Sequence, residues 1–432
     1  MKMLRFALPI LLFLFIQALY GAVDLWAVGR FATHDDVSAV ATGSHFMSLI
    51  TGFLTGLAMG TTAELAEKFT KGDIYSSGYV AGASIRVFVI VGAVIGVLLF
   101  TLAPVIAVVL NTPNEALDKT IIYLRICGIG SIAIAMFNLI NAIFQALGDS
   151  KTPLLFVLVA CVFNVFLDFM LVKVFNLGTV GVAVATVVSQ TMSVISSIIY
   201  IHKWHFPFRF TREQVDAHKG YGRKILRTGI PVGFQQVFIH CYYIVILGFA
   251  NTLGMVASAG VGIAERIVMF IMLIPLTFME TLTVFVAQNV AKGDRKAVKK
   301  CLTLGIIWSI CIGVVIFGVL EFYGDSIIRI FISDKEIVNA SYEFLKATAI
   351  ECLVLSVVYC ILGYMNGTKH TLFVMVQGAV AILGVKIPYA YYAVFKTTPN
   401  LFNLGLSLEY ASMFQLALCV FYFLICCKDE NY

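Results

Sequence analysis

The sequence predicts an all-α polytopic membrane protein whose twelve transmembrane helices form two pseudo-symmetric six-helix bundles. Three observations predict this fold class. Of the 432 residues, 60% are hydrophobic and only 12% are charged, whereas a soluble domain is typically about 25% charged. Apolar runs long enough to cross a bilayer recur along the whole chain, and motifs of the first half return in the second. One soluble core cannot hide so much apolar surface.

Each expected span is a run of about 20 mostly apolar residues, the length that crosses the hydrocarbon core of a bilayer. The first run follows a short basic stretch but lacks the small-residue cleavage site of a signal peptide, so we expect it to be retained. The eighth is long and contains Pro275, so it could be broken there or could include a cytoplasmic extension. The expected spans are residues 7–29, 44–66, 82–110, 120–146, 152–173, 179–201, 226–250, 257–290, 302–322, 342–366, 371–394 and 404–427.

The lysines and arginines orient these spans. With the N-terminus in the cytoplasm, most basic residues of the loops lie on the cytoplasmic side, as the positive-inside rule requires. The loops on the opposite side hold only Arg30, Lys119, Lys173, Arg329, Lys335 and Lys396. An even number of spans then places both termini in the cytoplasm. We expect a multi-pass protein of a prokaryotic plasma membrane.

A long polar and basic stretch separates the sixth span from the seventh. It divides the chain into an N-terminal bundle, residues 1–205, a cytoplasmic linker, residues 206–225, and a C-terminal bundle, residues 226–432. Basic residues in such a linker suit a cytoplasmic loop beside anionic lipid headgroups. We therefore expect contact with membrane lipids and no nucleic-acid partner.

The two halves resemble one another. The tripeptide KGD occurs at residues 71–73 and again at residues 292–294, and we expect Pro9 and Pro231 each to start the first helix of a half. Two halves with the same topology form a parallel repeat. Transporters built in this way bind substrate between the halves and rock one half against the other.

Two acids lie within apolar spans of the N-terminal half. Asp168, in the stretch LFVLVACVFNVFLDFMLV, shares a helix face with Asn164, and Asp24 shares a face with Gln17. An ionised carboxylate at the centre of a bilayer costs about 2.5–3.5 kcal/mol on insertion scales. We therefore expect Asp168 to point into the bundle, to hydrogen-bond Asn164 and Tyr123, and to share a site with Asp24.

Such a pair of acids indicates ion handling. Two neighbouring carboxylates repel one another unless a proton or a small cation lies between them. Asp24, Asp168 and Asn164 are therefore a candidate site for H⁺ or for Na⁺, and no other cofactor is expected. The structural alternative is a polar network that only joins the helices.

The C-terminal half carries different polar residues within its spans. The position equivalent to Asp24 is apolar, near Ile246, so we expect ion coupling in the N-terminal half. Glu265 and Glu351 form a possible second cation site. Lys386 could pair with an acid or lie near the outer headgroups.

The motifs together resemble the multidrug and toxic compound extrusion (MATE) family over essentially the whole chain. The resemblance rests on YGAVDLWAVGRFATHDDVSAVATG, GLAMGTTAELAEKFTKGD, FQALGDSKTPLLFVLVACVFNVFLD, LGTVGVAVATVVSQ and VGIAERIVMFIMLIPLTFMETLTVFVAQNVAKGD. It implies two six-helix lobes in a V around a central cleft. It also implies a transporter, not an enzyme, that exports amphipathic or cationic organic compounds in exchange for H⁺ or Na⁺ by alternating access.

The prokaryotic branch named for a DNA-damage-inducible gene (DinF-like) looks most similar, because the residues of its N-lobe cation site are matched here. The matching residues are Gln17, Asp24, Tyr123, Asn138, Asn141, Asn164, Asp168 and Thr186. The other bacterial branch places cation-binding acids in the C-lobe. Glu265 resembles one of these acids, and Glu351 is a loose match for another.

Two other functions remain open. A flippase for a lipid-linked precursor, from the wider superfamily, would need a basic cleft for a pyrophosphate headgroup, whereas the charges inside the N-terminal spans are acidic. A membrane-embedded enzyme with two carboxylates on a metal would need an Asp-rich motif at a membrane face, and the cytoplasmic loops contain none. We expect a monomer that handles small drug-like or cationic molecules.

Overall fold

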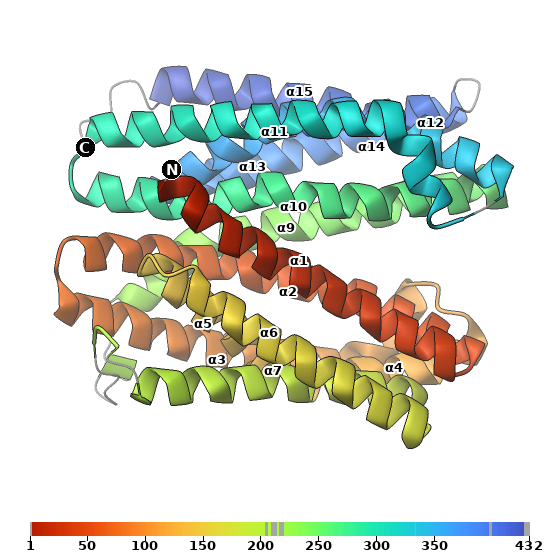
Figure 1. Cartoon of the computed structure of the whole chain (residues 1–432), viewed down its shortest axis with the longest axis horizontal. Helices are drawn as coiled ribbons and strands as arrows, with labels where there is room; N and C mark the ends of the chain where they lie inside the picture. The colour runs from red at the N-terminus through yellow and green to blue at the C-terminus, as the bar shows by residue number, and fades with distance from the viewer. Residues whose placement is uncertain are drawn as a thin grey trace. The chain divides into compact units, whose positions relative to one another are not determined.

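The computed structural model describes residues 2–203, 206–208, 214–215, 220–332, 334–396 and 400–426. These residues form helices joined by short loops, and no β-strand occurs among them (Figure 1). Eleven helices are long and apolar enough to cross a membrane, and one bent pair of shorter helices can form a twelfth span. The predicted all-α fold with twelve candidate spans is confirmed.

The chain divides into two compact units, unit 1 (Met1–Gly233) and unit 2 (Phe234–Tyr432). The boundary falls inside one continuous helix, α9 (Tyr221–Thr252). The expected linker, residues 206–225, lies partly outside the described residues, so the predicted domain boundaries stay a prediction.

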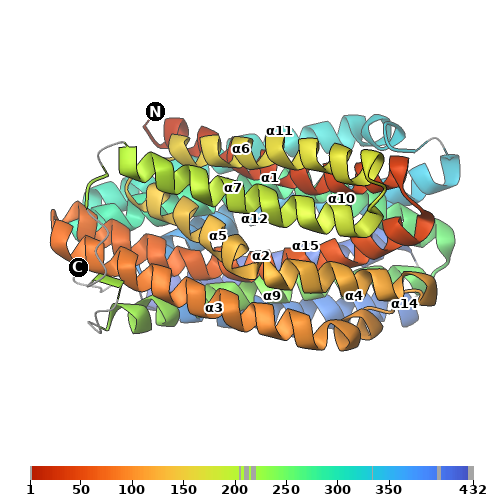
Figure 2. The ribbon, with the colours of Figure 1, turned by 90° about the horizontal axis from the view of Figure 1, so that it is seen from below.

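Unit 1 is a bundle in which α6 packs against both α1 and α7 (Figure 2). This packing matters for the site below, because each of the three helices carries at least one of its polar side chains. The elements of unit 1 before α9 are α1 (Lys2–Phe31), α2 (His34–Thr70), α3 (Ile74–Val109), α4 (Asn114–Ile129), α5 (Ser131–Ala146), α6 (Lys151–Asp168), the π-helical segment η1 (Phe169–Val174) and α7 (Gly178–Lys203).

In unit 2, α12 packs against α10, α11 and α15. Buried side chains of α9, α10, α12 and α15, among them Tyr242, Ile246 and Phe344, form the apolar core of this unit. After α9 its elements are α10 (Met255–Ala291), α11 (Arg295–Arg329), α12 (Lys335–Gly367), α13 (Thr371–Ala381), the π-helical segment η2 (Ile382–Lys386), α14 (Ile387–Phe395) and α15 (Leu401–Cys426).

The fourth expected span, residues 120–146, is not a single straight helix. It is the pair α4 and α5, bent by 55° at the break. Gly130 lies between the two helices, and a Cβ atom there would come within 2.4 Å of the Val187 side chain on α7. Glycine weakens a helix and leaves room for this close approach, which explains why the bend occurs here.

Two prolines also differ from expectation, because Pro9 and Pro231 were expected to start helices but lie inside α1 and α9. Of the two alternatives left open for the eighth span, the break does not occur, because α10 continues through Pro275. A proline removes one backbone hydrogen bond from a helix. Membrane helices tolerate this loss, because neighbouring groups can satisfy the freed carbonyl.

The repeated KGD motif has the same local structure in both units. Gly72 and Gly293 adopt left-handed backbone angles, φ 73° and 68°, which glycine adopts without steric cost. Asp73 and Asp294 then cap the next helix by accepting a backbone N–H, at 2.9 Å in both cases. The side chain and backbone amide of Ser76 hold the pKa of Asp73 below its ordinary value. The motif is therefore a tight turn between two antiparallel helices.

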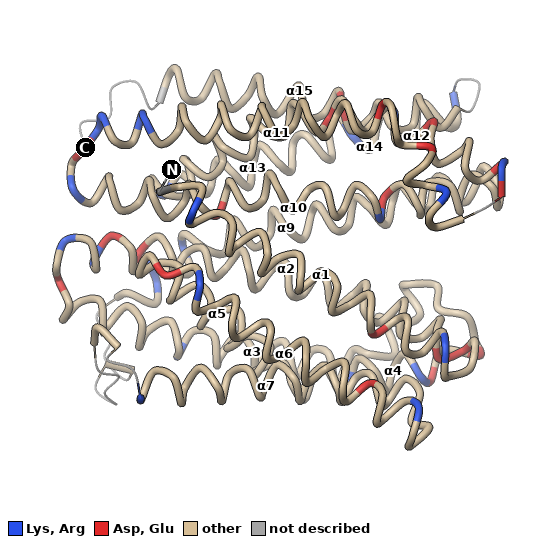
Figure 3. The backbone as a smooth tube through the Cα atoms, viewed as in Figure 1, with Lys and Arg blue, Asp and Glu red and all other residues tan. Residues whose placement is uncertain are grey.

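Charged residues gather mainly at helix ends and in loops, and the middle of most helices carries few of them (Figure 3). This distribution suits helices that cross a hydrocarbon layer, where an unpaired charge is costly. The few acids that do lie within helices are consequently the best candidates for function.

Close packing of α12 against α10 depends on glycine. A Cβ atom at Gly363 would lie 2.6 Å from the Met279 carbonyl oxygen, a backbone atom that cannot move away easily. In contrast, nothing lies within 4 Å of a Cβ atom at Gly318 on α11.

We predict that Gly363→Val lowers the free energy of unfolding by about 1–3 kcal/mol, because overpacking forces the two helices apart. Denaturant unfolding of the purified protein in detergent would measure the change. Gly318→Val is the matched control and should unfold like the wild type. Equal stability of the two variants would contradict the proposed packing.

Candidate cation-binding site

Asp24 is the centre of a buried polar cluster in unit 1. Asp24 is only 3% exposed. Asn164 on α6 donates from Nδ2 to Asp24 Oδ1 at 3.0 Å, and Thr186 on α7 donates from Oγ1 to Asp24 Oδ2 at 3.2 Å. Three helices thus meet at one carboxyl group. Hydrogen bonds to a carboxylate are stronger than those to a neutral acceptor, so this cluster also ties α1 to α6 and α7.

Asp168 lies one turn after Asn164, at the end of α6 where η1 begins. Its carboxyl lies beside that of Asp24. Both Asp168 oxygens are buried, and neither has a hydrogen-bond donor. The expectation that Asn164 and Tyr123 hydrogen-bond Asp168 is wrong, because the Asn164 amide donates to Asp24 instead. Tyr123 lies next to Cys127.

A second layer of hydroxyl groups surrounds the cluster, and sequence reasoning missed part of it. The Tyr20 hydroxyl donates to the Thr186 carbonyl oxygen at 3.1 Å and lies 2.7 Å from Ser189 Oγ. Tyr20 precedes Asp24 by four residues and so shares its helix face. That spacing was the signal that could have identified it.

Three of the predicted residues form no hydrogen bond with this cluster in the described part of the chain. Asn138 accepts a hydrogen bond from Thr55 on α2 at 3.1 Å and donates to the carbonyl oxygen of Ile134. Asn141 is buried, and neither its amide oxygen nor its amide nitrogen has a partner. Gln17 is half-buried on α1. The direct contacts therefore join Asp24, Asn164, Asp168 and Thr186.

This arrangement leaves an excess of acceptor oxygens. Both oxygens of Asp168 and the amide oxygen Oδ1 of Asn164 are buried without a donor. Within the described part of the chain, neither Asp24 nor Asp168 forms an ion pair with a lysine or an arginine. A proton shared by the two carboxyls would satisfy the excess, and so would a small cation bound to these oxygens. These oxygens are suitable ligands for either ion.

The two acids predicted in the other half have different direct partners. Glu351 on α12 lies 3.1 Å from Lys386 Nζ and accepts a hydrogen bond from Ser412 on α15 at 3.0 Å. Lys386 was expected to pair with an acid or to lie near the headgroups, and the structure shows the pair. Glu265 on α10 keeps one carboxyl oxygen, Oε1, buried without a partner. Glu351 is thus neutralised by a lysine of the protein itself.

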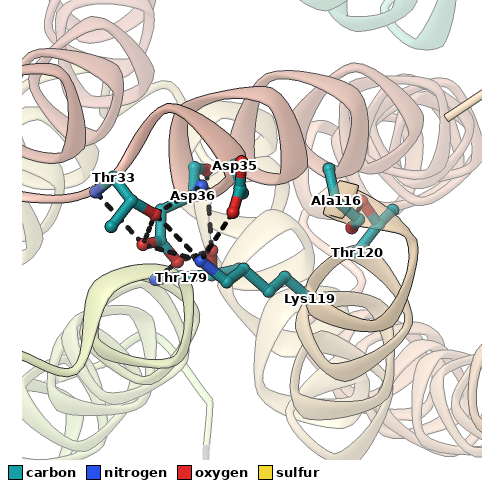
Figure 4. Close-up of polar contacts among 7 residues, drawn as sticks. All are labelled: Thr33, Asp35, Asp36, Ala116, Lys119, Thr120 and Thr179. Carbon is teal, nitrogen blue, oxygen red and sulfur yellow. Dashed lines mark hydrogen bonds and ion pairs between the residues drawn. The ribbon is translucent and has the colours of Figure 1, made fainter. Parts of the chain in front are cut away.

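A further acid, Asp36, joins three segments at one end of unit 1 (Figure 4). One of its oxygens accepts from the backbone N–H and the hydroxyl of Thr179, at 3.1 and 2.7 Å. The other accepts from the Thr33 hydroxyl at 2.6 Å and lies 3.1 Å from Lys119 Nζ. Asp35 lies farther from the same ammonium group, at 3.9 Å. We call Asp36, Thr33, Thr179 and Lys119 the Asp36 clasp. It ties the start of α2 to α4 and α7.

Comparison with known proteins identifies the same architecture. The family model MatE matches residues 9–170 and again residues 231–392, which agrees with the predicted repeat. The probable multidrug resistance protein YoeA of Bacillus subtilis is 24% identical over 98% of this chain and 92% of its own length. The multidrug export protein MepA of Staphylococcus haemolyticus is 24% identical over 88% of this chain and 85% of its own.

Solved structures agree in fold. An outward-facing multidrug resistance MATE family transporter of the MOP superfamily superimposes with a TM-score of 0.89 at 19% identity, over 98% of this chain and 94% of that one. A MOP superfamily transporter from Pyrococcus furiosus gives the same TM-score, identity and coverage. At this level of identity the likeness concerns the fold alone.

We predict that Asp36→Asn lowers the free energy of unfolding by about 1.5–3 kcal/mol, because a buried hydrogen-bonded charge is removed from the Asp36 clasp. Asp35→Asn is the matched control. The Asp35 side chain is 48% exposed, and exposed ion pairs contribute about 0–1 kcal/mol. Thermal and denaturant unfolding in detergent would compare the two. A loss for Asp35→Asn as large as that for Asp36→Asn would contradict this account.

Proposed function

Because this chain belongs to the MatE family, whose members are membrane transporters and not enzymes, we propose that it is a multidrug exporter. It moves small amphipathic or cationic organic molecules out of the cell in exchange for H⁺ or Na⁺. The names of two relatives, a probable multidrug resistance protein and a multidrug export protein, support the export of drug-like molecules.

One observation carries the ion-coupled part of the proposal: two buried carboxyls, Asp24 and Asp168, lie side by side without a basic partner. If both were ionised, two like charges would repel one another in an apolar surrounding. Binding of H⁺ or Na⁺ removes this repulsion, and release of the ion restores it. Asn164 and Thr186 support the bound state by fixing the orientation of Asp24.

Ion release would act on α1, because Asp24 is on α1 and Asp168 is on α6. Repulsion between the carboxyls favours a state in which α1 moves away from α6. Pro9 removes a backbone hydrogen bond within α1, and no other atom lies within 4 Å of a Cβ atom at Gly21. Both features make bending of α1 easier. Alternating access then requires that ion and drug favour different states of the protein.

The protein is a multi-pass membrane protein, and its cellular placement completes the proposal. We place it in the plasma membrane as a monomer, with both termini in the cytoplasm, because this orientation puts most basic loops on the cytoplasmic side.

A flippase for a lipid-linked precursor is the alternative. Such a headgroup carries a pyrophosphate, which basic side chains recognise. The buried charges of the cluster in unit 1 are acidic, so this cluster favours a cation over an anionic headgroup.

We predict that Asp24→Asn and Asp168→Asn each lower gradient-driven drug efflux tenfold or more. Allosteric coupling between ligands is typically worth about 5- to 150-fold in affinity, and each variant removes one of the two coupled charges. Purified protein in proteoliposomes would be given an imposed pH gradient or an imposed Na⁺ gradient, and efflux of a fluorescent organic cation would be followed. The gradient that drives the wild type identifies the ion.

The exposed acid Asp118 on α4 provides the control, and Asp118→Asn should transport like the wild type. Full efflux by both cluster variants would show that Asp24 and Asp168 are structural. If neither gradient moves a drug through the wild type, the exporter proposal fails, and translocation of a lipid-linked precursor becomes the next measurement.

A further inference from the structure

Unit 2 contains a buried ionic cluster that none of the roles above uses. Lys386, at the end of η2, has its Nζ 3.1 Å from Glu351 Oε1, and the two side chains are only 12% and 2% exposed. The Ser412 hydroxyl donates to the same Glu351 oxygen. The ammonium group also lies 4.6 Å from the centre of the Tyr242 ring, a favourable cation–π distance. The ammonium is therefore held firmly at Glu351.

A third charged group, Glu409, lies next to this pair. It precedes Ser412 by three residues on α15 and therefore occupies the same helix face. Glu409 is 3% exposed, and both of its carboxyl oxygens are buried without a hydrogen-bond partner. It also lies within the electric field of Glu351. The cluster thus contains two acids and one base.

The charges of this cluster determine which carboxyl group is protonated. Lys386 and Glu351 neutralise one another, so an ionised Glu409 would leave one uncompensated negative charge without a donor in an apolar interior. Burying such a carboxylate is strongly unfavourable, and the group takes up a proton instead. A metal ion is a poorer solution, because the Lys386 ammonium would repel it. A proton binds one oxygen directly and needs no set of ligands.

The tyrosines, the cysteine and the further acid named around the cluster do not supply a second positive charge. Tyr242 and Tyr243 on α9 and Cys352 and Tyr359 on α12 lie within the electric field of Glu351, and Glu265 on α10 acts on the same two tyrosines. All of these are acids or neutral groups. Lys386 is thus the one base among the named groups, and it is engaged by Glu351.

Unit 1 contains a cluster of similar composition with a different charge. There Asp24 accepts a hydrogen bond from α6 and another from a hydroxyl of α7. In unit 2 Glu351 is bound by Lys386, which follows α13, and by a hydroxyl of the last helix, α15. Each unit adds a second acid without a donor, Asp168 or Glu409. The Lys386 ammonium makes the net charge of the unit 2 cluster differ from that of the unit 1 cluster.

We propose that Glu409 is a proton-binding site of unit 2, separate from the Asp24–Asp168 pair, and that Lys386 determines its position by keeping Glu351 ionised. The proton resides on Glu409 because Glu351 has an ammonium and a hydroxyl donor while Glu409 has neither. Loss of that proton would leave Glu351 and Glu409 competing for Lys386.

Infrared spectroscopy of the full-length protein in lipid bilayers tests this directly, because the carbonyl stretch of a protonated carboxyl is resolved from that of a carboxylate. Asp24→Asn and Asp168→Asn are introduced first, so that the unit 1 pair does not contribute. At neutral pH we expect a protonated-carboxyl band that is weaker in Glu409→Gln. The band should persist in Glu343→Gln, which removes an exposed acid of α12.

Lys386→Met supplies the second arm. Without the ammonium, Glu351 should take up a proton as well, so the band should grow, and the added intensity should vanish when Glu351→Gln is combined with Lys386→Met. If Glu409→Gln does not fold, Glu409→Asp replaces it and should shift the band without removing it. An unchanged band in the Glu409 variant would overturn the proposal. These measurements need no transport, so their outcome is separate from that of the efflux assay.

Discussion

The structure depends on one constraint: a carboxyl group inside an apolar bundle must find its partners on other helices. A helix satisfies its own backbone, but a buried side chain within it has few polar neighbours on the same helix. Asp24 therefore obtains its donors from α6 and α7, and Glu351 obtains its partners from η2 and α15. These side-chain contacts leave the backbone hydrogen bonds of each helix intact, and they determine which helices must be neighbours.

The two units meet this constraint with different charges. In unit 1 the hydrogen-bond donors to Asp24 are neutral and the second acid, Asp168, has no donor, which is why the cation site is proposed there. In unit 2 a lysine compensates Glu351 permanently. In the proposed mechanism the pair in unit 1 couples transport to an ion. In unit 2 the Lys386–Glu351 pair joins helices, and the proton is placed on Glu409.

The π-helical segments lie beside these charged groups in both units. Asp168 is the last residue before η1, and Lys386 is the last residue of η2. A π-helical turn inserts an extra residue into a helix and so changes the direction of the side chains that follow. Neither segment was predicted, because helical periodicity over a whole span is insensitive to one inserted residue.

By itself the sequence determined the membrane class, the candidate spans, the internal repeat and the buried acids of the proposed cation site. These features follow from local properties: the length of apolar runs, the spacing of polar residues, and turns such as KGD, whose glycine and aspartate act within a few residues. Only the tertiary structure decided that Asn164 serves Asp24 instead of Asp168, that Tyr20 and Ser189 extend the cluster, and that Lys386 binds Glu351. Such pairings join residues up to 169 positions apart, and they depend on the packing and rotation of whole helices, which no local pattern specifies.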